Sequence, residues 1–156
     1  MQFLPFSPEL APYFDSINRQ WIQTMFTLEP VDEKVISDPQ TYIIDNEGYI
    51  WFAQHPEFGI VGTCALMKKD EGIYELTKMG VSEHARGKKI GEQLLRHVLE
   101  EAPKIAYNTL FLLTNSRCEP AIHLYEKLGF AHDGQILQQF GGGYARCNVA
   151  MRYCRF

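Results

Sequence analysis

The sequence lacks an excess of positive charge and any long apolar run. Its 19 acidic side chains outnumber its 15 lysines and arginines, and the net charge of -4 argues against a nucleic-acid-binding protein. No stretch is long and apolar enough to cross a membrane, and the N-terminus lacks the basic and apolar regions of a signal peptide. We therefore expect a cytoplasmic protein with neither nucleic acid nor membrane among its partners.

Cysteine and histidine spacings typical of metal sites are also missing. The cysteines form no CxxC pair and fall in predicted strands and at a helix start: Cys64, Cys118, Cys147 and Cys154. In a reducing cytoplasm we expect them to be free buried thiols. No two of the five histidines stand four residues apart, so the sequence predicts neither a structural nor a catalytic metal.

The length and composition suit one globular domain. With 156 residues, of which 46% are hydrophobic, the chain can bury a sizeable core without dividing into two. We predict a single domain over residues 1–156.

Helical patterns precede the predicted sheet. A short apolar start, "QFLPFS", indicates a strand, and Ser7 followed by Pro8 is typical of a helix start. Apolar residues recur at helical spacing from Tyr13 to Phe26. The segment "EPVDEKVISDP" predicts a second, short helix between two prolines.

Three runs rich in β-branched and aromatic residues follow, "GYIWFAQ", "GIVGTCALMK" and "GIYELTKMGV". The turn-prone segments between them predict an antiparallel meander. An amphipathic helix beginning near Ile90 separates the third run from the buried-type strand "NTLFLLT". Because a strand, a helix and a strand in succession require a crossover, Tyr74–Val81 and Leu110–Thr114 should be parallel.

The C-terminal part predicts one more helix and two strands. "PAIHLYEKLGF" has Pro120 in its first turn and Gly129 where helices commonly end in left-handed geometry. "FAHDGQILQQF" and "YARCNVAMRYC" are predicted strands, and "QFGGGYA" between them is either a mobile hairpin over a binding site or only a permissive turn. The order predicts an α+β fold, a mixed and mostly antiparallel sheet of six to seven strands with helices on both faces.

The segment "RGKKIG", Arg86–Gly91, links a predicted strand to a helix. The first N–H groups of a helix have no intrahelical partner, and nearby glycines let an anion approach them. The segment is therefore either an anion cradle with cationic support or an ordinary solvated helix start. It has neither GxxxxGK[ST] nor GxGxxG, which argues against a nucleoside-triphosphate loop and a Rossmann site.

A second motif favours the cradle. "YELTKMGVSEHARGKKIGEQLL" and "LLTNSRCEPAIHLYEKLGF" together closely resemble the acyl-CoA-binding core of the GNAT superfamily of N-acetyltransferases, in particular its small bacterial members. The first resembles the strand, pyrophosphate loop and helix of that core, with the pattern R-x-x-G-x-G. The second resembles its next strand and a helix ending in Y-x-K-x-G-F. Lys89 is a departure, because it stands where the pattern has its first glycine.

The resemblance implies direct transfer of an acetyl group from acetyl-CoA to an amine, with a parallel strand pair splayed around CoA. It implies that main-chain groups of Met79 to Val81 pair with the pantetheine arm and that an N–H near Met79 or Gly80 stabilises the oxyanion. A homodimer is expected only by analogy with the family. The residues implied to bind the cofactor are Met79, Gly80, Val81, Arg86, Gly87, Lys88, Lys89, Ile90, Gly91 and Asn115.

Two residues of the second motif have alternative interpretations. Tyr125 matches the general-acid tyrosine of the family, which protonates the departing thiolate, but its helical spacing alone would indicate core packing. Asn115 matches a residue that contacts the cofactor arm or an ordered water. The alternative for Asn115 is an Asx-type turn into the following helix.

The general base is chosen among carboxylates, because an alkylammonium near pKa ~10.4 must lose a proton before it attacks. Glu75 is the first choice, since it interrupts an apolar strand and resembles a glutamate found there in many family members. Strand alternation would place Glu75, Thr77, Met79 and Val81 on one face. The alternative for Glu75 is a salt bridge across the sheet.

Glu29 and Asp32 are alternative bases or acceptor-binding groups, because the resemblance places their turn beside the acceptor pocket. Their alternative role is to complement the dipole of a helix start. Trp21, at a helical apolar position, is expected in the core rather than against a substrate.

The resulting prediction is an acetyl-CoA-dependent N-acetyltransferase acting on a primary amine of a small molecule, an amino-acid derivative or a peptide. The alternative is a non-catalytic CoA or acyl-CoA sensor with the same fold. Retention of Tyr125 and Asn115 favours the enzyme. A nucleic-acid module that uses "RGKK" is disfavoured by the acidic net charge.

Overall fold

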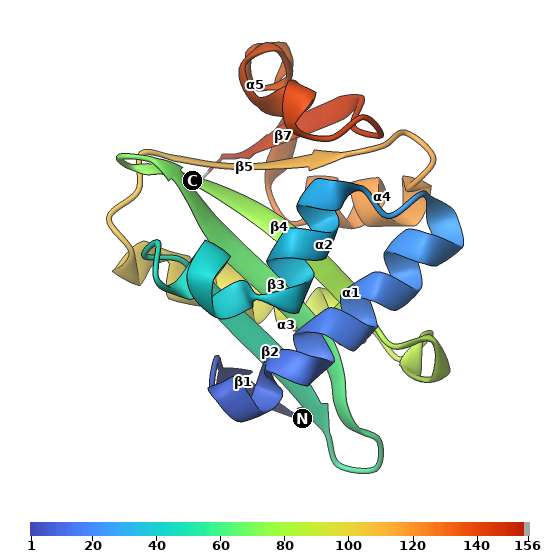
Figure 1. The fold of residues 1–156 in the computed structure, drawn as a ribbon. Coiled ribbons are helices and arrows are strands. Elements are labelled where there is room, and N and C mark those ends of the chain that lie inside the picture. The colour runs from blue at the N-terminus through green and yellow to red at the C-terminus, as the bar shows by residue number, and fades with distance from the viewer. Residues whose placement is uncertain (155–156) are drawn as a thin grey trace.

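A seven-stranded sheet organises the protein (Figure 1), which is described here from a computed structural model over residues 1–154. The sheet has the order β1-β2-β3-β4-β5-β7-β6. Its strands are β1 (Gln2–Pro5), β2 (Tyr49–His55), β3 (Gly59–Asp70), β4 (Ile73–Val81), β5 (Thr109–Thr114), β6 (Phe130–His132) and β7 (Val149–Tyr153). β4 and β5 are parallel, and the other neighbouring pairs are antiparallel. The predicted mixed sheet with one parallel pair is therefore confirmed.

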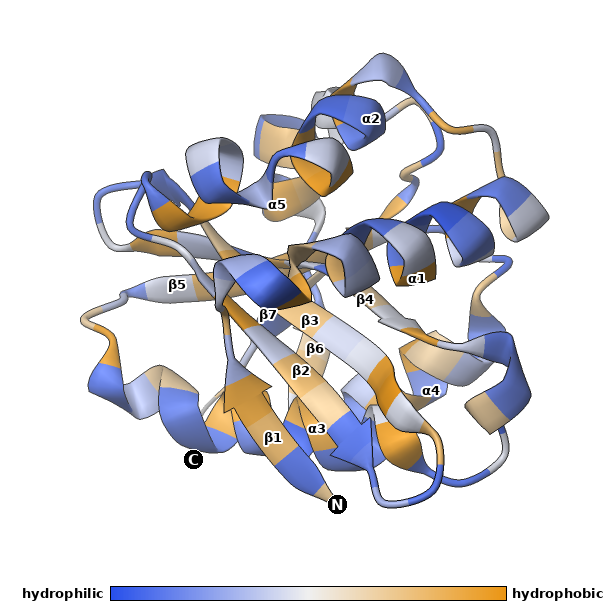
Figure 2. Cartoon of the chain, turned by 60° about the horizontal axis from the view of Figure 1, so that its bottom comes forward, coloured by the Kyte–Doolittle hydropathy of each residue, from blue (hydrophilic) through white to orange (hydrophobic). Residues whose placement is uncertain are grey.

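Helices cover both faces of this sheet (Figure 2). The α-helices are α1 (Ala11–Met25), α2 (Pro30–Ser37), α3 (Ile90–Glu101), α4 (Glu119–Lys127) and α5 (Gly134–Phe140). α1, α2 and α5 lie on one face, and α3 and α4 lie on the other. Prolines at the first turns of α2 and α4 explain why these helices begin where the sequence predicted. The predicted helix start at Ser7 and Pro8 is instead a 3-10 turn over Pro8–Leu10, and α1 follows it from Ala11.

Alternation along β5 shows how the two faces share one strand. Leu110 and Leu112 pack into the cluster that contains α3, whereas Phe111 is fully buried against Ile136 of α5. Phe14 of α1 belongs to a third cluster, together with residues of α2. The continuous apolar run of β5 is therefore explained by burial on both sides.

A β-bulge interrupts β4 at Lys78, whose φ is +51°. Gly80 pairs with Thr63 of β3, but Thr77 pairs with Ala65. Two residues of β4, Lys78 and Met79, therefore stand opposite a single residue of β3, and the strand bends there.

The bulge corrects one expectation about side-chain direction. Leu76 before the bulge and Met79 and Val81 after it all pack in the cluster on the α3 face. Glu75 alternates with Leu76 and so faces the other side, together with Thr77. The expectation that Glu75, Thr77, Met79 and Val81 share one face was wrong, because the extra residue reverses the alternation.

The segment after α4 corrects a second expectation. Strand β6 ends at His132, and residues 134–140 form α5 instead of continuing as a strand. Asp133 caps this helix, since its Oδ1 accepts hydrogen bonds from the backbone N–H groups of Gln135 and Ile136 at 3.0 and 3.2 Å. The three glycines form a short 3-10 turn, Gly141–Gly143, and not the apex of a hairpin.

The cysteines are free thiols in this structure. Cys64 is buried in β3, and Cys118 and Cys147 are partly buried. Cys154 is exposed, so the expectation of burial was wrong for this residue, which lies beyond the end of β7.

The parallel pairing of β4 and β5 ends at Leu76 and Leu112. Beyond that point Thr77, Gly80 and Val81 of β4 remain paired with β3, while Leu113 and Thr114 of β5 remain paired with β7. The two central strands therefore separate, and the edge of β4 that faces β5 has no strand partner there.

Candidate active site

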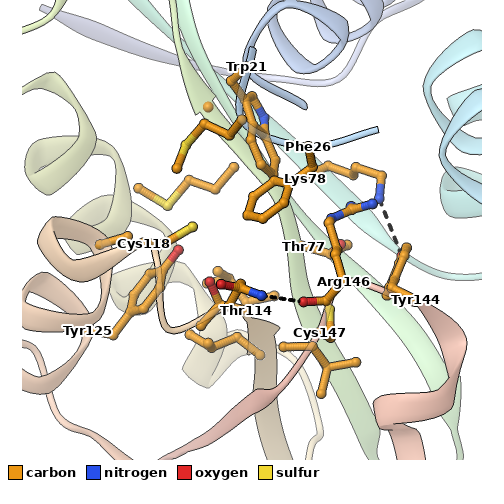
Figure 3. Close-up of a pocket in the computed structure, with 18 of the residues that line it drawn as sticks. Trp21, Phe26, Thr77, Lys78, Thr114, Cys118, Tyr125, Tyr144, Arg146 and Cys147 are labelled. Carbon is orange, nitrogen blue, oxygen red and sulfur yellow. Dashed lines mark hydrogen bonds between the residues drawn. The ribbon is translucent and has the colours of Figure 1, made fainter. Parts of the chain in front are cut away.

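A cavity of about 440 Å³ lies where β4 and β5 separate. Its walls come from both strands, the C-terminal end of α1, the start of α4 and the segment before β7. Figure 3 shows Tyr125 and Cys118 on one side of this cavity, with Lys78, Arg146 and Tyr144 on the other.

The predicted anion cradle forms the start of α3. The backbone at Gly87 and Lys89 is left-handed, with φ of +81° and +60°. Within the described residues, the backbone N–H groups of residues 87–91 donate no hydrogen bond. Lys89 thus adopts a left-handed geometry that glycine adopts more readily, and the amides stay available to an anion.

Only part of the predicted anion cradle lines the cavity. Arg86 lines the cavity, whereas Gly87, Lys88, Lys89, Ile90 and Gly91 lie beside it at the helix start. The Nζ atom of Lys88 lies 5.4 Å from the centre of the Phe58 ring. The donor set fits a phosphate group, because free amides and cationic side chains occur together at a helix N-terminus.

Main-chain atoms of β4 form the wall next to the cradle. Met79, Gly80 and Val81 line the cavity along the edge of β4 that lacks a strand partner. A Cβ atom at Gly80 would lie 2.5 Å from Cδ1 of Trp21, so a larger residue cannot stand there without displacing the indole. Trp21 is only partly buried and also lines the cavity, so it is not a simple core residue.

The second motif brings Tyr125 and Asn115 to the same cavity. The hydroxyl of Tyr125 points toward Cys118 in Figure 3, and desolvation raises the pKa of Tyr125 above its ordinary value. The Asn115 Nδ2 donates to the carbonyl of Arg146 at 2.7 Å, and its Oδ1 accepts from the Arg117 N–H at 2.8 Å. Asn115 therefore makes the alternative Asx turn while it also lines the cavity.

Glu75 lines the cavity and is 2% exposed. Its Oε1 has no hydrogen-bond partner among the described residues, and the nearest cation, Lys69 Nζ, is 3.8 Å away. Desolvation raises the pKa of this carboxyl above its ordinary value. The contact with Lys69 is the salt bridge across the sheet that was the alternative role of Glu75. Because this oxygen accepts no hydrogen bond, the carboxyl can also accept a proton from a group in the cavity.

Asp32 is the centre of a buried ion cluster. Its carboxylate accepts hydrogen bonds from Lys78 Nζ at 2.9 Å and from both terminal nitrogens of Arg146 at 2.7 and 2.9 Å. Glu29 accepts a further bond from Arg146 at 3.1 Å. Although burial alone would raise the pKa of Asp32, these cations hold it at about 2.

Glu29 and Asp32 do not line the cavity with the other sequence-predicted residues. They form a capping box at the start of α2, which matches their alternative role. The cavity is lined instead by the cations that they hold, Lys78 and Arg146. Sequence reasoning missed both cations, although Lys78 breaks an apolar strand just as Glu75 does.

Residues 13–130 match the model of the acetyltransferase (GNAT) family, and the chain therefore belongs to this family. Family members use acetyl-CoA as the acetyl donor. Within residues 1–154 no cluster of three or more histidine, cysteine or acidic side chains could hold a metal ion, and no helix could span a membrane.

Curated relatives resemble the chain over part of its length. The N-acetylaspartate synthetase of Xenopus tropicalis is 34% identical over 102 residues, which are 65% of this chain and 38% of that protein. The uncharacterised N-acetyltransferase YsnE of Bacillus subtilis is 37% identical over 75 residues, which are 47% of this chain and 50% of that protein. The chain thus spans half or less of the length of these relatives.

Solved structures confirm the fold over nearly the whole chain. A GNAT-family acetyltransferase from Staphylococcus aureus Mu50 superposes with a TM-score of 0.84, covering 97% of each chain at 19% sequence identity. At this level of identity the match establishes the fold, and the site must be argued from the residues of this chain.

The left-handed geometry at Lys89 predicts the effect of substitution there. Glycine avoids the steric cost of this conformation but has more backbone freedom to lose, so we expect Lys89→Gly to stabilise the fold by about 0.5 kcal/mol. Lys89→Val should destabilise it by about 1 kcal/mol, because β-branched residues tolerate this geometry least. Urea unfolding measures both, and a Lys89→Gly variant less stable than Lys89→Val would contradict the assignment.

The ion cluster predicts a large effect of Asp32→Asn on stability. The change leaves the buried Lys78 without a carboxylate and leaves the partly buried Arg146 with Glu29 alone, so the free energy of unfolding should fall by about 3 kcal/mol at neutral pH. Since the pKa of Asp32 is depressed from 3.8 to about 2, its contribution is complete above the unfolded value and is lost as pH falls toward 2. The difference between the variant and the wild type should therefore shrink over that range in urea unfolding.

The partly exposed ion pair of Asp15 with Arg19 supplies the control. Asp15→Asn should cost less than about 1 kcal/mol. If both variants lost the same free energy of unfolding, the buried cluster would contribute no more to stability than a partly exposed ion pair.

Proposed function

We propose that the protein is an acetyl-CoA-dependent N-acetyltransferase that transfers the acetyl group directly to a primary amine of a small molecule, an amino-acid derivative or a peptide. One observation carries the proposal: the cavity between the separated strands is lined by both an acid candidate, Tyr125, and a base candidate, Glu75. Family membership supports the acetyl donor and the class of reaction.

The unpaired backbone of the first motif supports the cofactor assignments. The free amides from Gly87 to Gly91, with Arg86, Lys88 and Lys89, would bind the pyrophosphate. The edge of β4 from Met79 to Val81 would pair with the pantetheine arm, because its hydrogen-bonding groups there have no strand partner. Asn115 would border the same arm at the end of β5.

Glu75 would act as the general base. Its raised pKa brings it closer to neutrality than an ordinary glutamate, which favours proton uptake from the acceptor ammonium, directly or through water. As the amine nitrogen bonds to the acetyl carbon, charge develops on the carbonyl oxygen. An N–H near Met79 or Gly80 would stabilise this charge.

Tyr125 would act as the general acid when the carbon–sulfur bond breaks. Its raised pKa keeps the hydroxyl protonated at neutral pH, so the proton remains available to the departing thiolate. Glu29 and Asp32 would serve the reaction indirectly, by holding Lys78 and Arg146 at the cavity wall.

Removal of the Tyr125 hydroxyl tests the acid. Tyr125→Phe should lower kcat by about 100-fold with little change in CoA affinity, because the proton matters most as the thiolate departs. Thiol release from acetyl-CoA across a panel of amines measures the rate, and calorimetry measures CoA binding.

Tyr153→Phe is the matched control, because Tyr153 packs against Phe130 as Tyr125 does but lies outside this cavity. Equal rates for Tyr125→Phe and the wild type would refute the acid assignment. CoA binding without turnover on any amine would indicate a sensor, and absence of CoA binding would overturn the proposed function.

The raised pKa of Glu75 predicts a pH effect. A base must be deprotonated, so kcat/KM of the wild type should fall as pH decreases through the raised pKa of Glu75. Glu75→Gln should lower kcat/KM by about 100-fold at neutral pH and abolish this limb of the profile. The exposed Glu71→Gln variant should keep the limb. If kcat/KM of Glu75→Gln still fell as pH decreases, the titration would belong to another group.

A further inference from the structure

The wall of the cavity opposite Tyr125 is cationic (Figure 3). Lys78, Arg117 and Arg146 line the cavity in addition to Arg86 of the cradle. Among the described lining residues, Glu75 is the single carboxylate. If Arg86 is left out, the lining of the cavity away from the phosphate cradle therefore contains three cationic side chains and one carboxylate.

Carboxylates outside the cavity fix the positions of two of these cations. Asp32 and Glu29 bind Lys78 and Arg146 from outside the cavity, so these cations are positioned and partly neutralised. The Arg146 guanidinium also lies 4.9 Å from the centre of the Tyr144 ring, which limits its movement.

Arg117 differs, because no carboxylate among the described residues pairs with it. One terminal nitrogen donates to the carbonyl of Met25 at 3.0 Å, and the guanidinium lies 5.0 Å from the centre of the Phe26 ring. The Arg146 guanidinium lies 5.8 Å from the centre of the same ring. Phe26 therefore brings two guanidinium groups to one edge of the cavity, and Arg117 keeps donors free for an anion.

We propose that the acceptor is a small amine that also carries a carboxylate, such as an amino acid with an apolar side chain. The proposal rests on the proposed function. Arg117, supported by Arg146, would bind the carboxylate, and the amine would lie toward Glu75. Trp21 and Phe26 would contact the apolar part.

The charge pattern also argues against polyamine acceptors. A polycation would place its second ammonium near Arg117, whose charge no described carboxylate offsets, so like charges would repel there. Lys78 and Arg146 add less to this repulsion, because Asp32 and Glu29 pair with them. A carboxylate in the same position replaces the missing partner of Arg117.

Matched acceptors test the proposal with the full chain. L-phenylalanine and L-leucine are compared with phenethylamine and 3-methylbutylamine, which lack only the carboxylate, and with spermidine. We expect the wild type to prefer the amino acids in kcat/KM, with spermidine the poorest acceptor. Arg117→Gln should lower kcat/KM for the amino acids about tenfold or more, mainly through KM, with a loss on the matched amines at least fivefold smaller.

The acceptors differ in the pKa of their amines, but this difference cancels when the kcat/KM of a variant is divided by that of the wild type for the same acceptor. Arg117→Lys should restore part of the preference, and Arg96→Gln, an exposed arginine paired with Glu92 on α3, is the matched control. Preference for the decarboxylated amines or spermidine, or an equal loss on both acceptor classes in Arg117→Gln, overturns the carboxylate proposal and leaves the acetyltransferase intact. Absence of transfer to every acceptor despite CoA binding overturns the proposed function itself.

Discussion

The separation of β4 from β5 is the constraint on which the site depends. Parallel pairing stops at Leu76 and Leu112, and a bulge at Lys78 bends β4 away while β3 keeps its pairing. The left-handed backbone at Lys78 costs free energy for a non-glycine residue. Its ammonium donates a buried hydrogen bond to Asp32, so this strained residue also links β4 to α2.

The cavity that results has two chemically different sides. Near Tyr125 the surroundings are desolvated and neutral, which keeps a hydroxyl protonated. On the other side, Asp32 neutralises part of the charge of Lys78 and Arg146 and fixes their positions. Glu75 lies in the same cavity, buried and with a raised pKa. Such an arrangement would separate a proton donor from a proton acceptor, as the proposed acetyl transfer to an amine requires.

Sequence patterns were most informative where local structure carries the signal. The start of α3 follows from an amphipathic stripe and free helix amides, and even the departure at Lys89 leaves the backbone geometry intact. Prediction failed where long-range contacts decide. Residues 134–140 have strand-like composition, but Ile136 and Phe140 pack as a helix on Phe111 of β5. The bulge at Lys78 likewise depends on pairing with β3 and left no clear mark in the sequence.

The sequence by itself determined the order of the elements apart from α5, the parallel central pair and the family motifs, because each rests on periodicity or on residues close together along the chain. Only the tertiary structure decided which side chains reach the cavity. Asp32, Lys78 and Arg146 are far apart along the chain, and their cluster exists only because α2, β4 and the segment before β7 meet. Charged side chains can be buried only where such long-range contacts pair them, and the cationic side of this cavity depends on the same contacts.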